Sequence, residues 1–190
     1  MNWQSRLATV FTLSLGALGL VGSVQAVMLS NGTTQFVQPP RLEGVTATQK
    51  TIRFPGSTYY FTLNLPETAG EPLQRLVISP DNSADRVDFD LNRTEAFEGT
   101  FDREGNKLPL QTVTQGPKTK AITIIFTPAI TAGKRITVGL YANHNPDGSG
   151  TYLYGVTAFP PGGQAYGQFL GYGRIQIYGD QTSFLLRQNR

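Results

Sequence analysis

The sequence predicts an all-β protein, a two-sheet sandwich of the immunoglobulin-like or a related Greek-key type. Three observations support this fold class. Nine or ten short β-type runs follow one another at intervals of about 8–12 residues, Gly and Pro residues punctuate them, and helix signals are few. The pattern contains no internal repeat and no break in composition, so we expect one domain. A closed barrel is the structural alternative.

The first 26 residues predict a secretory signal peptide. A basic start at Arg6 precedes an apolar segment, residues 7–21, and a small-residue triplet that ends at Ala26. The apolar segment is shorter than the ~20 residues of a membrane-spanning helix, although a retained membrane anchor is the alternative. We therefore expect a single mature domain over residues 27–180 and a C-terminal tail over residues 181–190. Its expected location is the periplasm or the extracellular space of a bacterium.

Composition excludes several classes of chemistry. The chain contains no cysteine, which excludes disulfides, thiolate metal sites and a cysteine nucleophile. A single domain of this length buries roughly 70% of its unfolded surface and can be stable without such crosslinks. The net charge of +3 is too small to indicate a nucleic-acid partner. Acidic residues are concentrated between Asp81 and Glu104, where eight of them outnumber three arginines.

The first half of the domain contains runs in which apolar and polar residues alternate with a period of two, as in half-buried strands. The β-type runs expected there are residues 33–37, 57–65, 73–79, 87–91, 95–101 and 108–114. Residues 41–53 show only a weak pattern. Residues 102–106 are rich in turn formers and predict a turn.

The second half contains four β-type runs in succession, residues 121–127, 135–141, 151–159 and 173–178. Ile122, Ile124 and Phe126 share one face, and the next run has the same arrangement, so both strands should face a common core. The connection over residues 128–133 is too long for a two-residue turn and predicts a crossing between two sheets. Residues 145–150 are dense in turn formers and predict a hairpin.

Two late segments carry a family resemblance. They read Tyr-Leu-Tyr-Gly-Val-Thr-Ala-Phe-Pro (residues 152–160) and Gly-Gln-Phe-Leu-Gly-Tyr-Gly-Arg-Ile-Gln-Ile-Tyr (residues 167–178), and they follow a Pro-Ala-x-x-Ala-Gly loop. The chain thereby resembles a family of exported cyanobacterial proteins catalogued as domain of unknown function twenty-eight-oh-eight. The resemblance implies a periplasmic or otherwise envelope-located β protein. It implies no activity, cofactor or functional residue.

Six of the eight tyrosines fall between residues 141 and 178, in a glycine-rich region. Flat aromatic rings beside small residues can form a surface on which sugar rings or peptides stack. The candidate ligand-binding residues are Tyr152, Tyr154, Tyr166 and Tyr172, beside a glycine-rich loop expected at residues 160–168. The alternative is that these tyrosines fill the core while their hydroxyls reach water or backbone.

The acidic segment suggests two further sites. Asp81 and Asp85 are weak candidates for a calcium site, because the regular ligand spacing and the bidentate glutamate of a calcium loop are missing. Asp88 and Asp90 would place two carboxyls ~6.5–7 Å apart on one strand face, within the range of an inverting glycosidase pair, although any amphipathic strand shows this pattern. His144 is the only histidine, so zinc or triad chemistry would depend on it. The alternative for His144 is a polar residue at a hairpin end.

Taken together, these patterns predict a non-catalytic exported envelope module that acts by binding or as a structural accessory and that needs no cofactor. Its expected partners are an envelope polysaccharide or an envelope protein, with no nucleic acid and no transmembrane segment after signal cleavage. Two alternatives stay open. One is a carbohydrate-active enzyme that uses carboxylates of residues 81–104, and the other is a calcium-stabilised adhesion-type domain.

Overall fold

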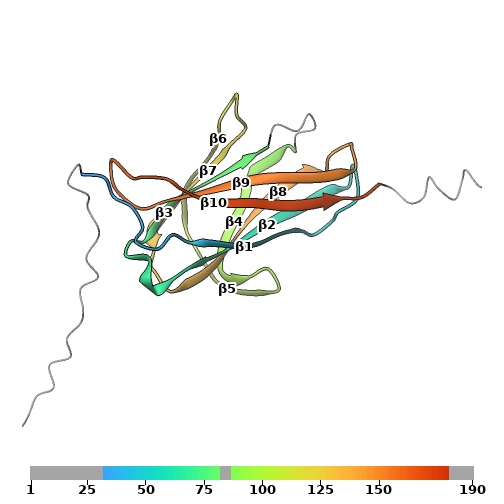
Figure 1. The fold of residues 1–190 in the computed structure, drawn as a ribbon. Coiled ribbons are helices and arrows are strands. Elements are labelled where there is room, and N and C mark those ends of the chain that lie inside the picture. Colours follow the sequence, from blue (N-terminus) through green and yellow to red (C-terminus); the bar gives the residue numbers. More distant parts are fainter. Residues whose placement is uncertain (1–31, 82–86, 180–190) are drawn as a thin grey trace, which may run out of the picture.

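The computed structural model of the chain describes residues 32–81 and 87–179, which form two packed antiparallel sheets of five strands each (Figure 1). The first, called sheet I, has the strand order β1-β2-β8-β4-β5, and the second, sheet II, has the order β10-β9-β3-β7-β6. The predicted two-sheet sandwich is therefore confirmed. The predicted signal peptide and C-terminal tail lie outside the described residues. Within the described part of the chain, no helix has the length and apolar character to cross a membrane.

The described residues form ten strands and one short 3-10 helix. In chain order these are β1 (Arg41–Ala47), β2 (Pro55–Leu65), η1 (Glu67–Ala69), β3 (Leu73–Pro80), β4 (Phe89–Thr100), β5 (Arg103–Lys107), β6 (Leu110–Gln115), β7 (Ile122–Ile130), β8 (Lys134–His144), β9 (Gly150–Phe159) and β10 (Gln168–Ile177). Strand β1 falls in the weakly patterned part of the sequence. Its register shifts between Leu42 and Gly44, which interrupts the period of two by which strands are recognised.

Three other expectations need correction. The runs predicted at 87–91 and 95–101 belong to one strand, β4, whose pairing with β8 shifts between Asp90 and Glu95. The turn predicted at 102–106 is mostly strand β5. Residues 33–37 contribute an isolated bridge at Thr34, not a full strand.

Connections between the sheets show how strand β8 constrains the topology. The crossing predicted for residues 128–133 is confirmed, since β7 belongs to sheet II and β8 to sheet I. The hairpin predicted at residues 145–150 is wrong, because β9 lies in sheet II. Strand β8 pairs with β2 on one side and with β4 on the other. Both of its edges are occupied, so β9 cannot pair with it and crosses to the other sheet.

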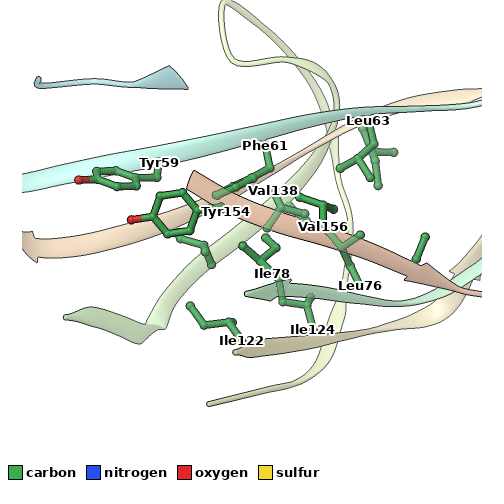
Figure 2. Close-up of a cluster of buried hydrophobic side chains, with 14 of the residues drawn as sticks. Tyr59, Phe61, Leu63, Leu76, Ile78, Ile122, Ile124, Val138, Tyr154 and Val156 are labelled. Atoms are coloured by element: carbon green, nitrogen blue, oxygen red, sulfur yellow. The ribbon is translucent and has the colours of Figure 1, made fainter. Parts of the chain in front are cut away.

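The core lies between the sheets, and Figure 2 shows its central side chains. Alternate residues of β2 and β8 point inward from sheet I, and alternate residues of β3, β7 and β9 meet them from sheet II. Examples are Phe61 and Val138 facing Ile78, Ile124 and Val156, all fully buried. Each such side chain contributes about 1.5–3 kcal/mol relative to exposure, which explains how the domain is stable without disulfides.

A buried asparagine closes one end of the sandwich. Asn145, directly after β8, is 0% exposed. Its Oδ1 accepts a hydrogen bond from the Tyr59 hydroxyl (3.0 Å), and its Nδ2 donates to the carbonyls of Gln49 (3.0 Å) and Thr51 (2.8 Å). Because every polar atom of this side chain has a partner, the residue can be buried without the cost of an unsatisfied group.

Candidate binding surface

The four candidate tyrosines are divided between the core and the surface. Tyr152 and Tyr154 lie on β9 and are only 7% and 2% exposed. The Tyr154 ring makes edge-to-face contacts with Tyr59 and Phe61, and the Tyr152 hydroxyl donates to the carbonyl of Gly148 at 2.8 Å. The interpretation of these two residues as a ligand-binding surface is therefore corrected. The alternation of β9 directs both rings toward sheet I.

Burial affects the chemistry of Tyr154 as well as its accessibility. Burial is the main cause that raises the pKa of its hydroxyl, with smaller contributions from neighbouring Tyr59 and Tyr152. The hydroxyl therefore stays neutral, and the residue serves the core.

Tyr166 and Tyr172 are both exposed. Tyr166 belongs to the loop between β9 and β10, whereas Tyr172 lies on β10 and is 61% exposed. Tyr172 contacts Phe169, another exposed residue of β10, with the ring centroids 5.2 Å apart and the planes inclined at 71°. We call the rings of Phe169 and Tyr172 the aromatic platform.

A bulge in β10 explains why both platform rings point outward. Residues three apart on a regular strand point to opposite faces of a sheet. Here Phe169 pairs with Thr157 and Tyr172 pairs with Gly155, because the register shifts between Phe169 and Gly171. Gly171 has φ 118°, a conformation that favours glycine. Bulges of this kind re-aim side chains, and this one places both rings on the outer face of sheet II.

The platform rests directly on the backbone of β9. A Cβ atom at Gly155 would lie 3.2 Å from the Phe169 ring and 3.4 Å from the Tyr172 ring, so a larger residue there would displace one of them. Beside the rings is a shallow hollow of about 150 Å³, lined by Ser79, Pro80, Asp81, Gly155, Thr157, Phe169 and Tyr172. The hollow thus combines two exposed apolar rings with hydroxyl and carboxylate groups.

A third ring on the same face is covered. Phe159, at the end of β9, lies under the guanidinium of Arg75, whose Cζ is 3.9 Å from the ring centroid. Cation–π contacts of this type stabilise a side-chain arrangement. This pair borders the region of the platform but does not present a free ring face as Phe169 and Tyr172 do.

The two carboxylates considered for glycoside hydrolysis make separate hydrogen bonds. Asp88 accepts a hydrogen bond from Asn143 Nδ2 at 2.9 Å, and Asp90 accepts one from the Asn92 backbone N–H at 3.1 Å. The hollow beside Asp88, about 200 Å³, is lined otherwise by Val87, Gln115 and Lys120. A two-carboxylate mechanism needs both groups at one substrate bond, and Asp90 is not part of the lining of this hollow.

The described residues contain no cluster of side chains that could bind a metal ion. His144 ends β8, and its Nδ1 lies 3.1 Å from the carbonyl oxygen of Asn145. No three His, Cys, Asp or Glu side chains among residues 32–81 and 87–179 are grouped so that they could hold a metal ion. Of the calcium candidates, Asp81 borders the hollow beside the platform, and Asp85 lies outside the described residues.

Of the two exposed rings, the sequence-based candidates include Tyr172 but not Phe169. The concentration of tyrosines on which the candidates rest does not include this phenylalanine. The signal that could have found it is the sequence Phe169-Leu-Gly-Tyr172, in which glycine within a strand indicates a bulge. A bulge between the two aromatic residues would have predicted that they share a face.

These features define a two-sheet all-β domain with an exposed aromatic surface. The chain belongs to the family described as protein of unknown function (DUF2808), whose sequence pattern matches residues 33–177. The family resemblance inferred from the sequence is thereby confirmed, while export and cyanobacterial origin remain expectations. A search of curated proteins finds no match to this sequence.

Several solved structures show a distant likeness. The C-terminal domain of the Streptococcus pyogenes antigen I/II-family protein AspA is 10% identical, with a TM-score of 0.41, over 67% of this chain and 41% of that one. A collagen-binding domain from a Staphylococcus aureus adhesin is 7% identical, with a TM-score of 0.37, over 69% and 99%. A cohesin from the archaeon Archaeoglobus fulgidus is 8% identical, with a TM-score of 0.38, over 75% and 96%. The likeness spans less than half of the AspA domain, and similarity at this level transfers no ligand or partner.

Proposed function

We propose that this protein is a non-catalytic envelope module that binds polysaccharide through the aromatic platform. The observation that carries this proposal is the bulge at Gly171, which aims Phe169 and Tyr172 to one face above the bare backbone of Gly155. Because both rings are exposed to solvent, they do not contribute the folding free energy that burial of an aromatic side chain provides. Exposed apolar groups gathered in this way mark interaction sites.

The chemistry of the hollow fits a sugar ring. A pyranose has an apolar face of C–H bonds and a rim of hydroxyls. The rings of Phe169 and Tyr172 can pack against the apolar face, and the polar groups of Ser79, Asp81 and Thr157 can hydrogen-bond the rim. The hollow is shallow and lies on an open sheet face, which suits a long polymer that passes over it.

The envelope location rests on the predicted signal peptide, since the apolar segment before Ala26 has the form of a secretory leader. A polysaccharide of the cell envelope is therefore the natural ligand class. The described hollow that Asp88 lines does not include Asp90, which supports binding without catalysis.

Retention of the full chain on insoluble cell-wall polysaccharide tests the proposal. We expect Tyr172→Ala and Phe169→Ala each to weaken retention about tenfold, as for aromatic residues that dominate a binding surface. Tyr178→Ala is the matched control, because Tyr178 is 57% exposed and follows the far end of the same strand. Both platform variants remove exposed rings, so their melting temperatures should stay close to that of the unmodified chain.

Unchanged retention of both platform variants would refute polysaccharide binding at this surface. Equal losses for the platform variants and for Tyr178→Ala would also refute it. Capture of an envelope protein that depends on Tyr172, without retention on polysaccharide, would replace the proposed ligand class.

A further inference from the structure

The outer face of sheet I carries a groove that is distinct from the aromatic platform. Its volume is about 280 Å³. It is lined by β1, by β2, and by the end of β4 together with the turn that follows it. The lining residues are Glu43, Gly44, Val45, Thr46, Tyr60, Thr62, Thr100, Phe101 and Asp102. The two sheets and the core separate this groove from Phe169 and Tyr172.

A second glycine bulge builds this groove. The pairing of β4 with β5 shifts between Phe97 and Gly99, and Gly99 has φ 93°. A Cβ atom there would lie 2.3 Å from the carbonyl oxygen of Arg103, so the hairpin requires glycine at this position. The Thr137 hydroxyl donates to the Gly99 carbonyl at 2.7 Å and holds the bend against the sheet.

The bend brings an aromatic ring across the sheet. Phe101, which follows β4, stacks on Tyr60 of β2 with centroids 5.8 Å apart and planes inclined at 21°. The Tyr60 ring lies close to the backbone of β8, since a Cβ atom built at Gly139 would be 2.9 Å from it. Phe101 remains 49% exposed. Gly44 leaves the β1 side open, since nothing lies within 4 Å of a Cβ built there.

The charged groups that line the groove are both acidic. The carboxylates of Glu43 and Asp102 belong to its lining, which contains no lysine or arginine. Arg135 pairs with Glu43 at 2.6 Å. Asp102 accepts a hydrogen bond from the Thr100 hydroxyl at 2.5 Å, and this bond is the main cause that lowers the pKa of Asp102 and keeps it charged.

More distant groups of both charges act on Tyr60. Burial is the first cause that raises the pKa of Tyr60, and the carboxylates of Glu95 and Glu104 add to it. Lys107, the nearby cation, opposes this rise in pKa and is paired with Glu95 at 2.6 Å. Arg103 follows Asp102 in the chain but does not line the groove.

We propose that this groove binds a single cationic side chain, the lysine or arginine of a partner protein. Its size lies at the lower limit of ligand sites, about 300 Å³, which suits one side chain. The apolar stem of the side chain would lie along Phe101, and its charge would meet the ring faces and the Asp102 carboxylate. Charge complementarity favours a cation, because Glu43 is already paired with Arg135, and the Asp102 carboxylate would repel a carboxylate or phosphate.

A titration followed by nuclear magnetic resonance tests this inference on the ¹⁵N-labelled full chain. The probe is Nα-acetyl-L-lysine amide, and its matched control is Nα-acetyl-L-norleucine amide, which keeps the stem but lacks the ammonium group. We expect the lysine probe to shift the backbone amides of Gly44, Thr46 and Phe101. Its affinity should exceed that of the norleucine probe at least about fivefold at low salt.

Three variants locate the effect. Asp102→Asn should weaken lysine binding about fivefold, whereas Asp147→Asn, which alters an exposed carboxylate elsewhere, should not. Gly44→Leu should abolish binding by filling the groove, where nothing lies within 4 Å of a Cβ atom built at this position. Tyr172→Ala should leave lysine binding unchanged, so that failure of this inference is distinguishable from failure of the proposed function.

Equal binding of the two probes would overturn the inference, as would shifts confined to residues outside the groove or no shift at all. Full lysine affinity in Asp102→Asn would overturn it as well.

Discussion

Replacement of Asn145 by alanine tests how the end of the sandwich is held together. The side chain joins three separate parts of the chain, since it bonds Tyr59 of β2 and the carbonyls of Gln49 and Thr51 before that strand. Alanine removes all three hydrogen bonds. The main chain bond from the Asn145 N–H to the Phe54 carbonyl is retained.

The expected loss follows from the partners that remain. The Gln49 carbonyl still accepts a bond from the Ser57 hydroxyl at 2.9 Å, and the Thr51 carbonyl still accepts one from the Phe54 N–H at 3.4 Å. The full penalty for an orphaned buried group therefore does not apply to these carbonyls. At about 1 kcal/mol for each lost bond, the free energy of unfolding should fall by about 3 kcal/mol. In a domain of this size that corresponds to a decrease in melting temperature of roughly 6–12 °C.

Urea denaturation, followed by far-ultraviolet circular dichroism, measures the change in the free energy of unfolding. The dependence of this free energy on urea concentration should be the same for all variants. Asn143→Ala is the matched control, because this exposed asparagine makes one side-chain bond, to Asp88. It should cost less than about 1 kcal/mol. If Asn145→Ala and Asn143→Ala have the same unfolding free energy, the buried asparagine does not stabilise the end of the sandwich.

Two further predictions concern the platform bulge and a buried acid. Gly171→Ala should destabilise the domain by about 1–3 kcal/mol through backbone strain at φ 118° and should reduce retention on polysaccharide. Gly179→Ala, which also has open space at Cβ, is its control, and full retention of Gly171→Ala would contradict the role of the bulge. Glu71 is buried, its Oε1 has no hydrogen-bond partner, and burial raises the pKa of its carboxyl. The folded state therefore favours the protonated form of Glu71. The stabilisation that results is complete below the ordinary pKa of 4.5, and it is lost as the pH rises through the raised pKa of the folded state. The urea midpoint should therefore fall more steeply over that range in the unmodified chain than in Glu71→Gln, and parallel pH profiles would refute this.

Strand periodicity explains why the class of fold was predictable. In β2, Tyr59, Phe61 and Leu63 alternate with polar residues, and all three are fully buried between the sheets. A period of two needs only neighbouring residues to be read, so the sequence reveals which face of such a strand is buried. Strand β1 was missed because its bulge between Leu42 and Gly44 breaks this local period.

The candidate site was less predictable, because it depends on pairing. Tyr154 and Tyr172 look alike in the sequence, yet one is in the core and the other on the surface. Two features decide which tyrosine is buried. One is which alternate residues of β9 face the core, and the other is the register in which β10 pairs with β9. Register is set by contacts between segments, and composition does not contain that information.

The sequence by itself determined that this protein is an all-β sandwich without disulfides, since alternation, turn residues and the absence of cysteine are properties of the chain read residue by residue. Only the tertiary structure decided that β9 leaves β8 for the other sheet and that the bulges at Gly171 and Gly99 place aromatic rings on opposite outer faces. The physical reason is that an occupied strand edge and a shifted register exist only once distant segments have paired.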